Sequence, residues 1–429
     1  LKRIIAAEDS KDDFATLRRT LGKMKTGAVQ TLLIPDESSA EGTYKRIVDG
    51  DEITQLLLER NEQHFHQAHG TPFTQGELAK QLGRTGTGEA AEQILNGTFP
   101  IDDLHTTDAT KALLRHLRRK EDFTEFDQHI SGAEWLAGFK KWNENTSTSH
   151  FSGRDLSKYK ALYKFPESKA SQNDQAQEAE DHDMLFDIIA QIANLALTHE
   201  HPLQRWTKVV NTMLEKLPNN PRIDKLRVIH LFEADMNFFF GMLWNRRLVQ
   251  HAEAHQALSQ DQWGNRAGKN AIDAVLMKQF SFITAALTRT PLISFDKDAK
   301  ACYDRMVMAL VNLQAQQLGM PAQVCNLISN TSDATEYHLK TSMGVSTEFY
   351  KSTTDHPLYG AGQGKRDAPA GWLVLSTLLM EALTDKATGA SFCDPRQTTT
   401  VHRAIDGYVD DVTAFTNNFE TALQRTANW

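Results

Sequence analysis

Two adjacent carboxylates, Asp410 and Asp411, stand at the tip of a strand–turn–strand pattern that spans residues 401–416. A second short strand is predicted over residues 292–295, and this strand runs into Asp298. If the two patterns are neighbours in one sheet, their carboxylates would repel one another unless a divalent cation neutralises them. Hard oxygen ligands select Mg²⁺ or Mn²⁺. The pattern by itself is compatible either with an exposed acidic turn or with carboxylates that hold a metal ion at the ends of two strands.

The composition is that of a globular, multi-domain chain. It has 429 residues, of which 40% are hydrophobic and 24% are charged, so that two or three packed units are expected. The net charge of −8 gives no hint of nucleic acid, and a polyanionic partner would require local basic patches or bound cations. The three widely spaced cysteines, Cys302, Cys325 and Cys393, exclude a disulfide scaffold and a Cys-rich zinc site. An intracellular, reducing compartment is the expectation.

Neither a membrane anchor nor a leader is predicted. The richest apolar run, residues 188–197, is shorter than the roughly 18 to 20 residues that span a bilayer. The chain begins at Leu1 without a charged-then-apolar leader, and we expect it to be a fragment of a longer protein. No membrane partner is therefore expected.

Periodicity divides the chain into three stretches. Residues 1–130 read as helices joined by polar loops, and residues 131–290 contain an acidic insert at 171–183 that predicts a surface loop. Residues 291–429 change character, with strands at both ends and a helix predicted from Tyr303 to Leu313.

Six blocks, in the right order between about residues 131 and 416, resemble those of reverse transcriptases of the non-LTR retrotransposon type. The blocks are Ser152-Gly153-Arg154 through Lys160; Lys216 with Arg227-Val228-Ile229; Gln262-Trp263-Gly264-Asn265-Arg266; Phe295-Asp296-Lys297-Asp298, similar to motif A; Tyr359-Gly360-Ala361-Gly362-Gln363-Gly364, similar to motif B; and Tyr408-Val409-Asp410-Asp411, similar to motif C. The last block alone is a weak signal, whereas six blocks in register are a strong one.

The resemblance implies an α+β fold with the fingers and palm of a right-hand polymerase, in which helices back an antiparallel palm sheet. It implies a helical segment at 1–130, fingers at 131–290 and a truncated palm at 291–429, with the thumb missing. The implied activity is RNA-directed DNA polymerisation in retrotransposition, in which a dNTP is added to a primer 3′-hydroxyl with the aid of two Mg²⁺ or Mn²⁺ ions. The implied partners are an RNA template and a DNA primer, and the implied place of action is the nucleus. The oligomeric state stays open.

The resemblance also assigns roles to the acidic residues. Asp298, Asp410 and Asp411 would be the catalytic metal ligands, and the backbone carbonyl of Ala299 would add one more. Asp296 is the alternative to Asp298; the family spacing to the following Tyr-Asp pair favours Asp298.

The remaining assignments concern the substrates. Tyr303 matches the steric gate that excludes a 2′-hydroxyl. Gln363 and Gly364 would lie against the template base and the incoming nucleotide, where a missing side chain permits close approach. Lys216, Arg227 and Arg266 would contact triphosphate or template phosphates.

Two departures and several alternatives accompany this interpretation. Val228 and Asn237 replace the Pro and Lys that many relatives carry. The basic and aromatic residues at 139–142 and 158–165 would either follow a phosphate backbone or cover a helical core. The His-rich sets around His64 and His251 are expected to be solvated helix faces. Rival functions are a nucleic-acid-binding remnant without synthesis and a polymerase that uses ribonucleotides.

Overall fold

The computed structural model describes residues 29–36, 42–119, 123–141, 146–149, 172–386 and 389–421. Helices and small sheets are mixed, as expected for the α+β class. The chain forms two compact units, and each draws on three separate segments. Unit 1 comprises Leu1–Gln67, Gln128–Leu243 and Asn326–Arg366; unit 2 comprises Ala68–Asp127, Trp244–Cys325 and Asp367–Trp429. This interleaving differs from the three consecutive domains that the sequence suggested.

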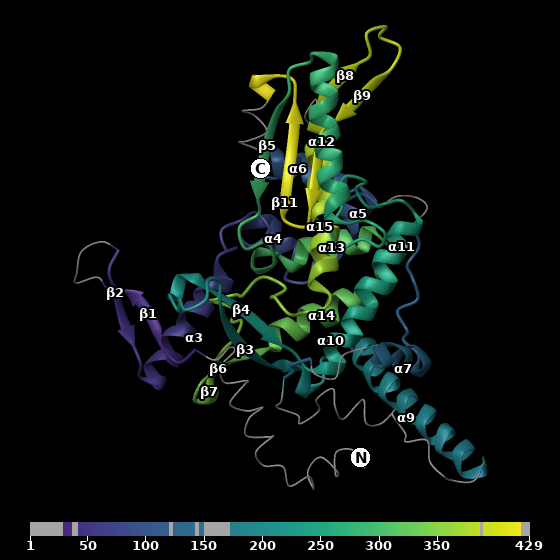
Figure 1. Ribbon diagram of the computed structural model, residues 1–429. Helices are drawn as coiled ribbons and strands as arrows, with labels where there is room; N and C mark the ends of the chain where they lie inside the picture. Colours follow the sequence, from purple (N-terminus) through teal and green to yellow (C-terminus); the bar gives the residue numbers. More distant parts are fainter. Residues whose placement is uncertain are drawn as a thin grey trace. The chain divides into compact units, whose positions relative to one another are not determined.

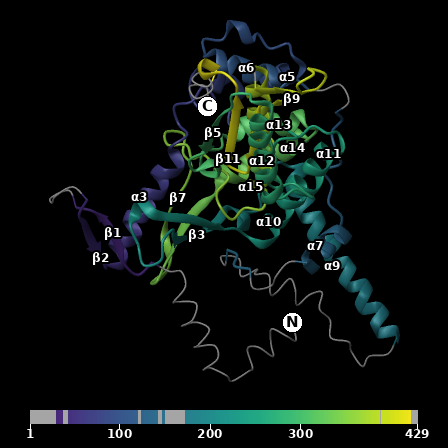
Figure 2. The ribbon, with the colours of Figure 1, turned by 45° about the horizontal axis from the view of Figure 1, so that its top comes forward.

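Unit 1 is built on a four-stranded sheet with the strand order β4-β3-β6-β7. Its strands are β3 (Lys208–Glu215), β4 (Leu226–Leu231), β6 (Glu336–Thr341) and β7 (Gly344–Tyr350). β3 pairs antiparallel with β4 and parallel with β6. Helix α3 (Gly50–His66) packs on β6 and β7 (Figure 2) and buries Ile53, Leu57 and Phe65 in a core shared with Met213 and Leu339. This confirms the helical pattern predicted there.

The rest of unit 1 corrects two sequence expectations. A hairpin of β1 (Leu32–Pro35) and β2 (Tyr44–Ile47) lies within the segment that was expected to be helical. The acidic insert at 171–183 is not a loop, because α9 runs from Gln172 to Thr198. Its Gln, Ala and Glu residues have high helix propensity, which outweighs the missing apolar period. The other helices of unit 1 are α7 (Gly132–Lys141), η2 (Gln204–Thr207), η3 (Ile223–Lys225) and α10 (Ala234–Gly241).

Unit 2 contains an antiparallel three-stranded sheet with the strand order β10-β11-β5. The strands are β5 (Ile293–Asp298), β10 (Ile405–Tyr408) and β11 (Asp411–Thr416), which confirms both predicted strand patterns. One face packs on α12 (Ala271–Thr288), where Phe282 meets Phe415 edge to face. The other face packs on α15 (Ala368–Lys386), where Met380 and Leu383 contact Ile405 and Val412. Figure 1 shows β5 and β11 side by side, with α12 along them.

Smaller elements complete unit 2. They are α4 (Gly76–Leu82), α5 (Glu89–Asn96), η1 (Ile101–Asp103), α6 (Asp108–His116), α11 (Val249–Ala254), η5 (Cys302–Arg305), α13 (Met308–Gln317), β8 (Ala390–Cys393) and β9 (Thr400–Arg403). The π-helical stretch η4 (Met242–Leu248) and α14 (Ala322–Ala334) contribute residues to both units. The helix predicted from Tyr303 divides in two: Tyr303 lies in the 3₁₀ turn η5, and α13 begins only at Met308.

Helix α12 overturns the expectation that no apolar run is long enough to cross a membrane. It has 18 residues and a mean hydropathy of 1.2, so it passes that test by length and composition. Its outer face exposes Ile272, Val275, Leu276, Phe280, Ile283 and Leu287. The opposite face is committed to the sheet, because Lys278 donates to Asp296 on β5 and Ala285 is buried beside Phe415. α12 is therefore an integral part of unit 2.

Phe415 anchors the sheet of unit 2 against α12, and no part of its side chain is exposed. We predict that Phe415→Ala lowers the free energy of unfolding by about 3 to 5 kcal/mol, through lost burial and the cavity that remains. Phe419→Ala, at a side chain that is 67% exposed, is the matched control and should change stability by less than about 0.5 kcal/mol. Denaturant unfolding measures both, and equal stability of the two variants would contradict the packing described.

Candidate active site

The register of β5 against β11 brings the predicted metal ligands together. Asp298 is the cross-strand partner of Asp411, and Asp296 is the partner of Thr413. Directly opposed residues of an antiparallel pair, and residues two apart on one strand, project from the same face of a sheet. Asp296, Asp298 and Asp411 therefore share one face. Asp410 joins them at the turn, because the backbone N–H of Ala299 donates to its carbonyl oxygen at 3.2 Å.

The charges at this edge act on one another. The pKa of the Asp411 carboxyl is raised, first by partial burial and then by the negative charges of Asp410, Asp298 and Asp296. Burial, followed by the charge of Asp410, raises the pKa of the nearby Cys302 thiol to about 12. Both shifts have the sign expected where carboxylates crowd together. A cation at this edge would relieve the repulsion.

Asp296 differs from the other acids in having a cationic partner of its own. Lys278 Nζ donates to Asp296 Oδ1 at 2.5 Å, and Thr413 Oγ1 donates to the same oxygen at 2.6 Å. These two hydrogen bonds, with Lys278 the larger cause, lower the pKa of Asp296. The protein itself thus compensates the charge of Asp296. This difference favours Asp298 as the metal ligand of motif A.

The donor set suits a hard divalent cation. The backbone register places Asp298 at the end of β5 opposite Asp411 at the start of β11, and the Ala299 N–H donates to the Asp410 carbonyl oxygen beside them. Among the residues that the structure describes, no three or more His, Cys, Asp or Glu side chains form a ready-made metal group. The backbone register is therefore the feature that fits Mg²⁺ or Mn²⁺ at Asp298, Asp410 and Asp411.

Tyr303 lies beside the same turn. Its half-buried ring meets Trp372 edge to face, with 6.5 Å between the ring centroids. Burial is the main cause that raises the pKa of its hydroxyl, a hydrogen bond with Asn265 opposes the shift, and the charge of Asp410 adds to it. Tyr303 therefore lies within electrostatic reach of Asp410, and its assignment as a steric gate stays a prediction.

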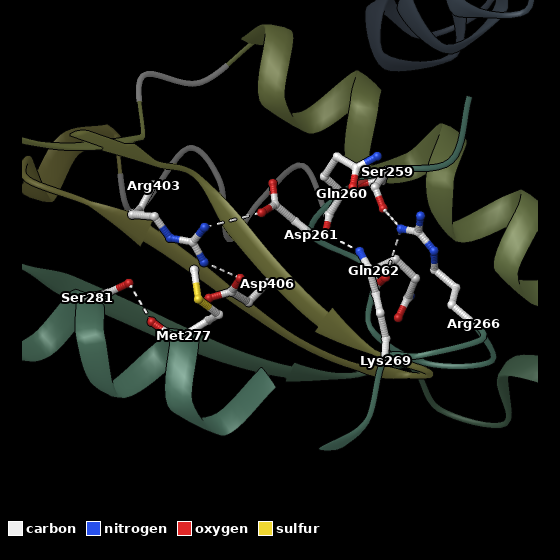
Figure 3. Close-up of polar contacts among 10 residues, drawn as sticks. All are labelled: Ser259, Gln260, Asp261, Gln262, Arg266, Lys269, Met277, Ser281, Arg403 and Asp406. Atoms are coloured by element: carbon white, nitrogen blue, oxygen red, sulfur yellow. Dashed lines mark hydrogen bonds and ion pairs between the residues drawn. The ribbon is translucent and has the colours of Figure 1, made fainter. Parts of the chain in front are cut away.

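Arg266 takes part in a different set of contacts from the one expected. Only 8% of it is exposed, and its guanidinium forms two hydrogen bonds to the Glu253 carboxylate at 2.6 and 2.7 Å. Its remaining donor meets the carbonyl oxygens of Ser259 and Gln262 (Figure 3). These contacts hold the 259–266 loop together, so the geometry does not support a phosphate-binding role for Arg266. The same guanidinium pairs with Glu253, the residue that lies between His251 and His255 in the sequence.

The motif B residues lie in unit 1 and are held against β4. His230 N–H donates to the Gln363 carbonyl oxygen at 2.7 Å. Gly364 has a φ of 110°, and a Cβ added there would lie 2.3 Å from the His230 carbonyl oxygen, so only glycine fits. The buried Asn237 donates to the Gly364 carbonyl oxygen and accepts from the Arg366 N–H. The departure at Asn237 thus has a structural role, since this side chain shapes the motif B loop.

Lys216 and Arg227 are both exposed in unit 1. Arg227 is the cross-strand partner of Leu214 on β3, and Lys216 follows two residues after Leu214. The two cationic side chains therefore project from the same face of the β3–β4 pair. This is an arrangement that can contact a phosphate backbone.

Some sequence expectations fall elsewhere. The block at 152–160, the aromatic–basic run at 158–165 and Trp142 lie outside the described residues. Phe139 is fully buried, so it cannot stack on a base.

Three residues that contact the turn or Tyr303 were not predicted from the sequence: Gln262, Trp372 and Asn265. Gln262 and Asn265 belong to one of the six blocks, which was the only signal for them. The chain matches no protein-family model and none of the curated proteins with which it was compared.

We predict that Asp298→Asn and Asp410→Asn each weaken Mn²⁺ binding by about tenfold or more, because each removes a charged oxygen ligand. Asp296→Asn is the matched control and should bind Mn²⁺ nearly as well as the wild type, since Lys278 already compensates that charge. Electron paramagnetic resonance of free Mn²⁺ during a titration measures this binding. An Asp296→Asn variant that loses binding while Asp298→Asn keeps it would reverse the assignment.

The same site predicts a pH dependence. Protons and metal ions compete for the Asp411 carboxylate, whose pKa is raised. The affinity for Mn²⁺ should therefore be complete above this raised pKa and fall as the pH drops through it, at a higher pH than for an ordinary aspartate. A Mn²⁺ titration at several pH values tests this, and an affinity that changes only below the usual aspartate range would contradict it.

Proposed function

We propose that the chain is the catalytic part of an RNA-directed DNA polymerase that adds a dNTP to a primer 3′-hydroxyl and serves retrotransposition. The observation that carries the proposal is the pairing of Asp298 with Asp411, with Asp410 bound alongside through Ala299. Two sequence blocks more than a hundred residues apart place three aspartates at neighbouring backbone positions at one end of a sheet. A structural sheet edge has no need for such a charge cluster, whereas nucleotidyl transfer does.

Asp298, Asp410 and Asp411 would hold two Mg²⁺ or Mn²⁺ ions. When bound, the ions stabilise charge on the triphosphate and on the attacking primer oxygen. The protein contributes position: β5 and β11 hold the carboxylates in register, and the Ala299 N–H fixes the turn against β5. The thiol of Cys302, with a pKa of about 12, stays protonated near neutral pH and has no part as a nucleophile.

The proposed substrate contacts come from two sets of residues. In unit 2, the Tyr303 ring would pack against C2′ of the sugar and leave no room for a 2′-hydroxyl. In unit 1, Gln363 and Gly364 would lie against the template base and incoming nucleotide, and Lys216 and Arg227 would contact template phosphates. Support for the second group comes from the exposed cations of β3–β4 and the glycine-only backbone at Gly364.

An intracellular, reducing compartment is the proposed setting, with the nucleus as the place of action. Cys302 and Cys325 are free and buried, which suits a protein that folds where thiols stay reduced.

The decisive experiment is primer extension on an RNA template with Mg²⁺. Wild-type protein should incorporate dNTP, and Asp410→Asn should lower the rate by about a thousandfold or more, because metal-assisted charge stabilisation is worth several kcal/mol. Asp296→Asn should retain most of the activity. Equal incorporation by the wild type and Asp410→Asn would defeat the metal assignment. RNA binding without incorporation by any variant would instead favour a non-catalytic remnant.

Tyr303 provides a test of substrate choice. Tyr303→Ala should reduce the preference for dNTP over NTP by about 10- to 200-fold, the range expected for one steric contact. Tyr303→Phe is the matched control: it keeps the ring, loses the hydroxyl that meets Asn265, and should keep the preference. Competitive incorporation of dNTP and NTP measures the ratio. A wild type that prefers NTP would point to an RNA polymerase instead.

A further inference from the structure

The turn that carries Asp410 contains a strained residue. Tyr408 and Asp411 close the β10–β11 hairpin around Val409 and Asp410, and Val409 has a φ of 58°. The two-residue hairpin turns that suit the twist of antiparallel strands require a positive φ at the first central residue, and glycine, asparagine or aspartate normally supplies it. A β-branched residue keeps this conformation only where its surroundings enforce it. The contacts of Val409 therefore determine the backbone conformation of the turn.

Gln262 makes two of these contacts with its side-chain amide. Val409 N–H donates to Gln262 Oε1 at 3.1 Å, and Gln262 Nε2 donates to the Val409 carbonyl oxygen at 3.3 Å. The amide is itself oriented, because Gly264 N–H donates to Oε1 and Nε2 donates to Ser376 Oγ, both at 3.0 Å. Gln262 is only 1% exposed. One buried side chain thus holds both backbone groups of the strained residue.

Two further contacts close the turn from other sides. Trp372 Nε1 donates to the Val409 carbonyl oxygen at 2.7 Å, from α15. Gly264 lies so close that an added Cβ would stand 2.4 Å from the Val409 nitrogen. No room remains for the turn to relax towards the 262–264 loop.

The loop that carries Gln262 is anchored to β10. Gly407 N–H donates to the Asp261 carbonyl oxygen, and Trp263 N–H donates to the Gly407 carbonyl oxygen, both at 2.8 Å. Arg403 bridges the carboxylates of Asp261 and Asp406 (Figure 3). The loop is therefore joined to β10 by an isolated parallel bridge between Gln262 and Gly407, and this bridge fixes the backbone from which Gln262 contacts Val409.

We propose that Gln262 and Trp372 are positioning residues, which hold Val409 in its left-handed conformation and thereby set the Asp410 carboxylate against Asp298 for cation binding. The proposal deepens the proposed function, on which it rests. Neither residue would contact the cation. Each acts through the backbone of Val409, which is joined to Asp410 by a peptide bond.

The first test is Mn²⁺ binding by Gln262→Met, which keeps a side chain of similar length and removes the two hydrogen bonds to Val409 together with those to Gly264 and Ser376. The affinity should fall about tenfold, since each lost hydrogen bond has a modest net value. Gln260→Met, at an exposed side chain in the same loop, is the matched control and should bind Mn²⁺ like the wild type. A folded Gln262→Met protein with wild-type Mn²⁺ affinity would overturn the proposal.

Trp372→Phe gives a second route if Gln262→Met does not fold. It keeps a ring beside Tyr303, removes the indole N–H that reaches Val409 and shortens the buried side chain. Its Mn²⁺ affinity should fall severalfold with little change in melting temperature. A folded Trp372→Phe protein with unchanged affinity would refute the role of Trp372, and with an unfolded Gln262→Met it would overturn the proposal as a whole.

A double-mutant cycle separates positioning from general loosening. Glycine adopts a positive φ without help, so in a Val409→Gly background Gln262→Met should weaken Mn²⁺ binding less than threefold. A full tenfold effect in that background would show that Gln262 does not act through Val409.

In primer extension, Gln262→Met should raise the Mg²⁺ concentration for half-maximal rate while the dNTP preference stays unchanged. If the wild type binds Mn²⁺ yet incorporates nothing, the proposed function fails while the binding results still decide the role of Gln262.

Discussion

The pairing of β5 with β11 is the constraint on which the candidate site depends. It joins the strand that ends at Asp298 to the strand that begins at Asp411, with the two acids directly opposite each other. Neither helix on the faces of this sheet could create that meeting, since each contacts only one face. The energy for it comes from apolar burial around Phe415 and Val412, some distance along the strands from the charges. Apolar packing around Phe415 and Val412 thus holds β5 and β11 together although the carboxylates of Asp298 and Asp411 repel each other.

The acids of unit 2 differ in the partners that compensate them. Asp296 forms an ion pair with Lys278, whereas Asp406 and Asp261 share the single cation of Arg403. Burial, as the largest cause, raises the pKa of Asp261 and of Asp406 despite that arginine. Asp411 has carboxylates as its main charged neighbours and only a weaker opposing influence from Lys278. The distribution of cations, more than the number of acids, marks the edge where a metal ion would bind.

Local pattern was sufficient for part of the fold and insufficient for the rest. Strand β5 and the β10–β11 hairpin followed from alternation and turn residues, and α3 followed from helical spacing. The insert at 171–183 was misjudged because its helix lacks an apolar stripe, and the helix at Tyr303 because a 3₁₀ turn interrupts the periodic positions. Arg266 was assigned by residue type, yet its neighbours use its donors for loop structure. Burial partners are set by distant segments, which a local pattern does not contain.

By itself, the sequence determined which residue types were available: carboxylates at the ends of two strand patterns, a tyrosine close behind one of them, and glycines where the backbone needs positive φ. Only the tertiary structure decided that Asp298 faces Asp411, that Lys278 takes Asp296 out of the set, and that Gln262 and Trp372 enclose Val409. The physical reason is that strand identity is encoded by neighbours along the chain, whereas register and charge compensation arise between segments that meet only after folding.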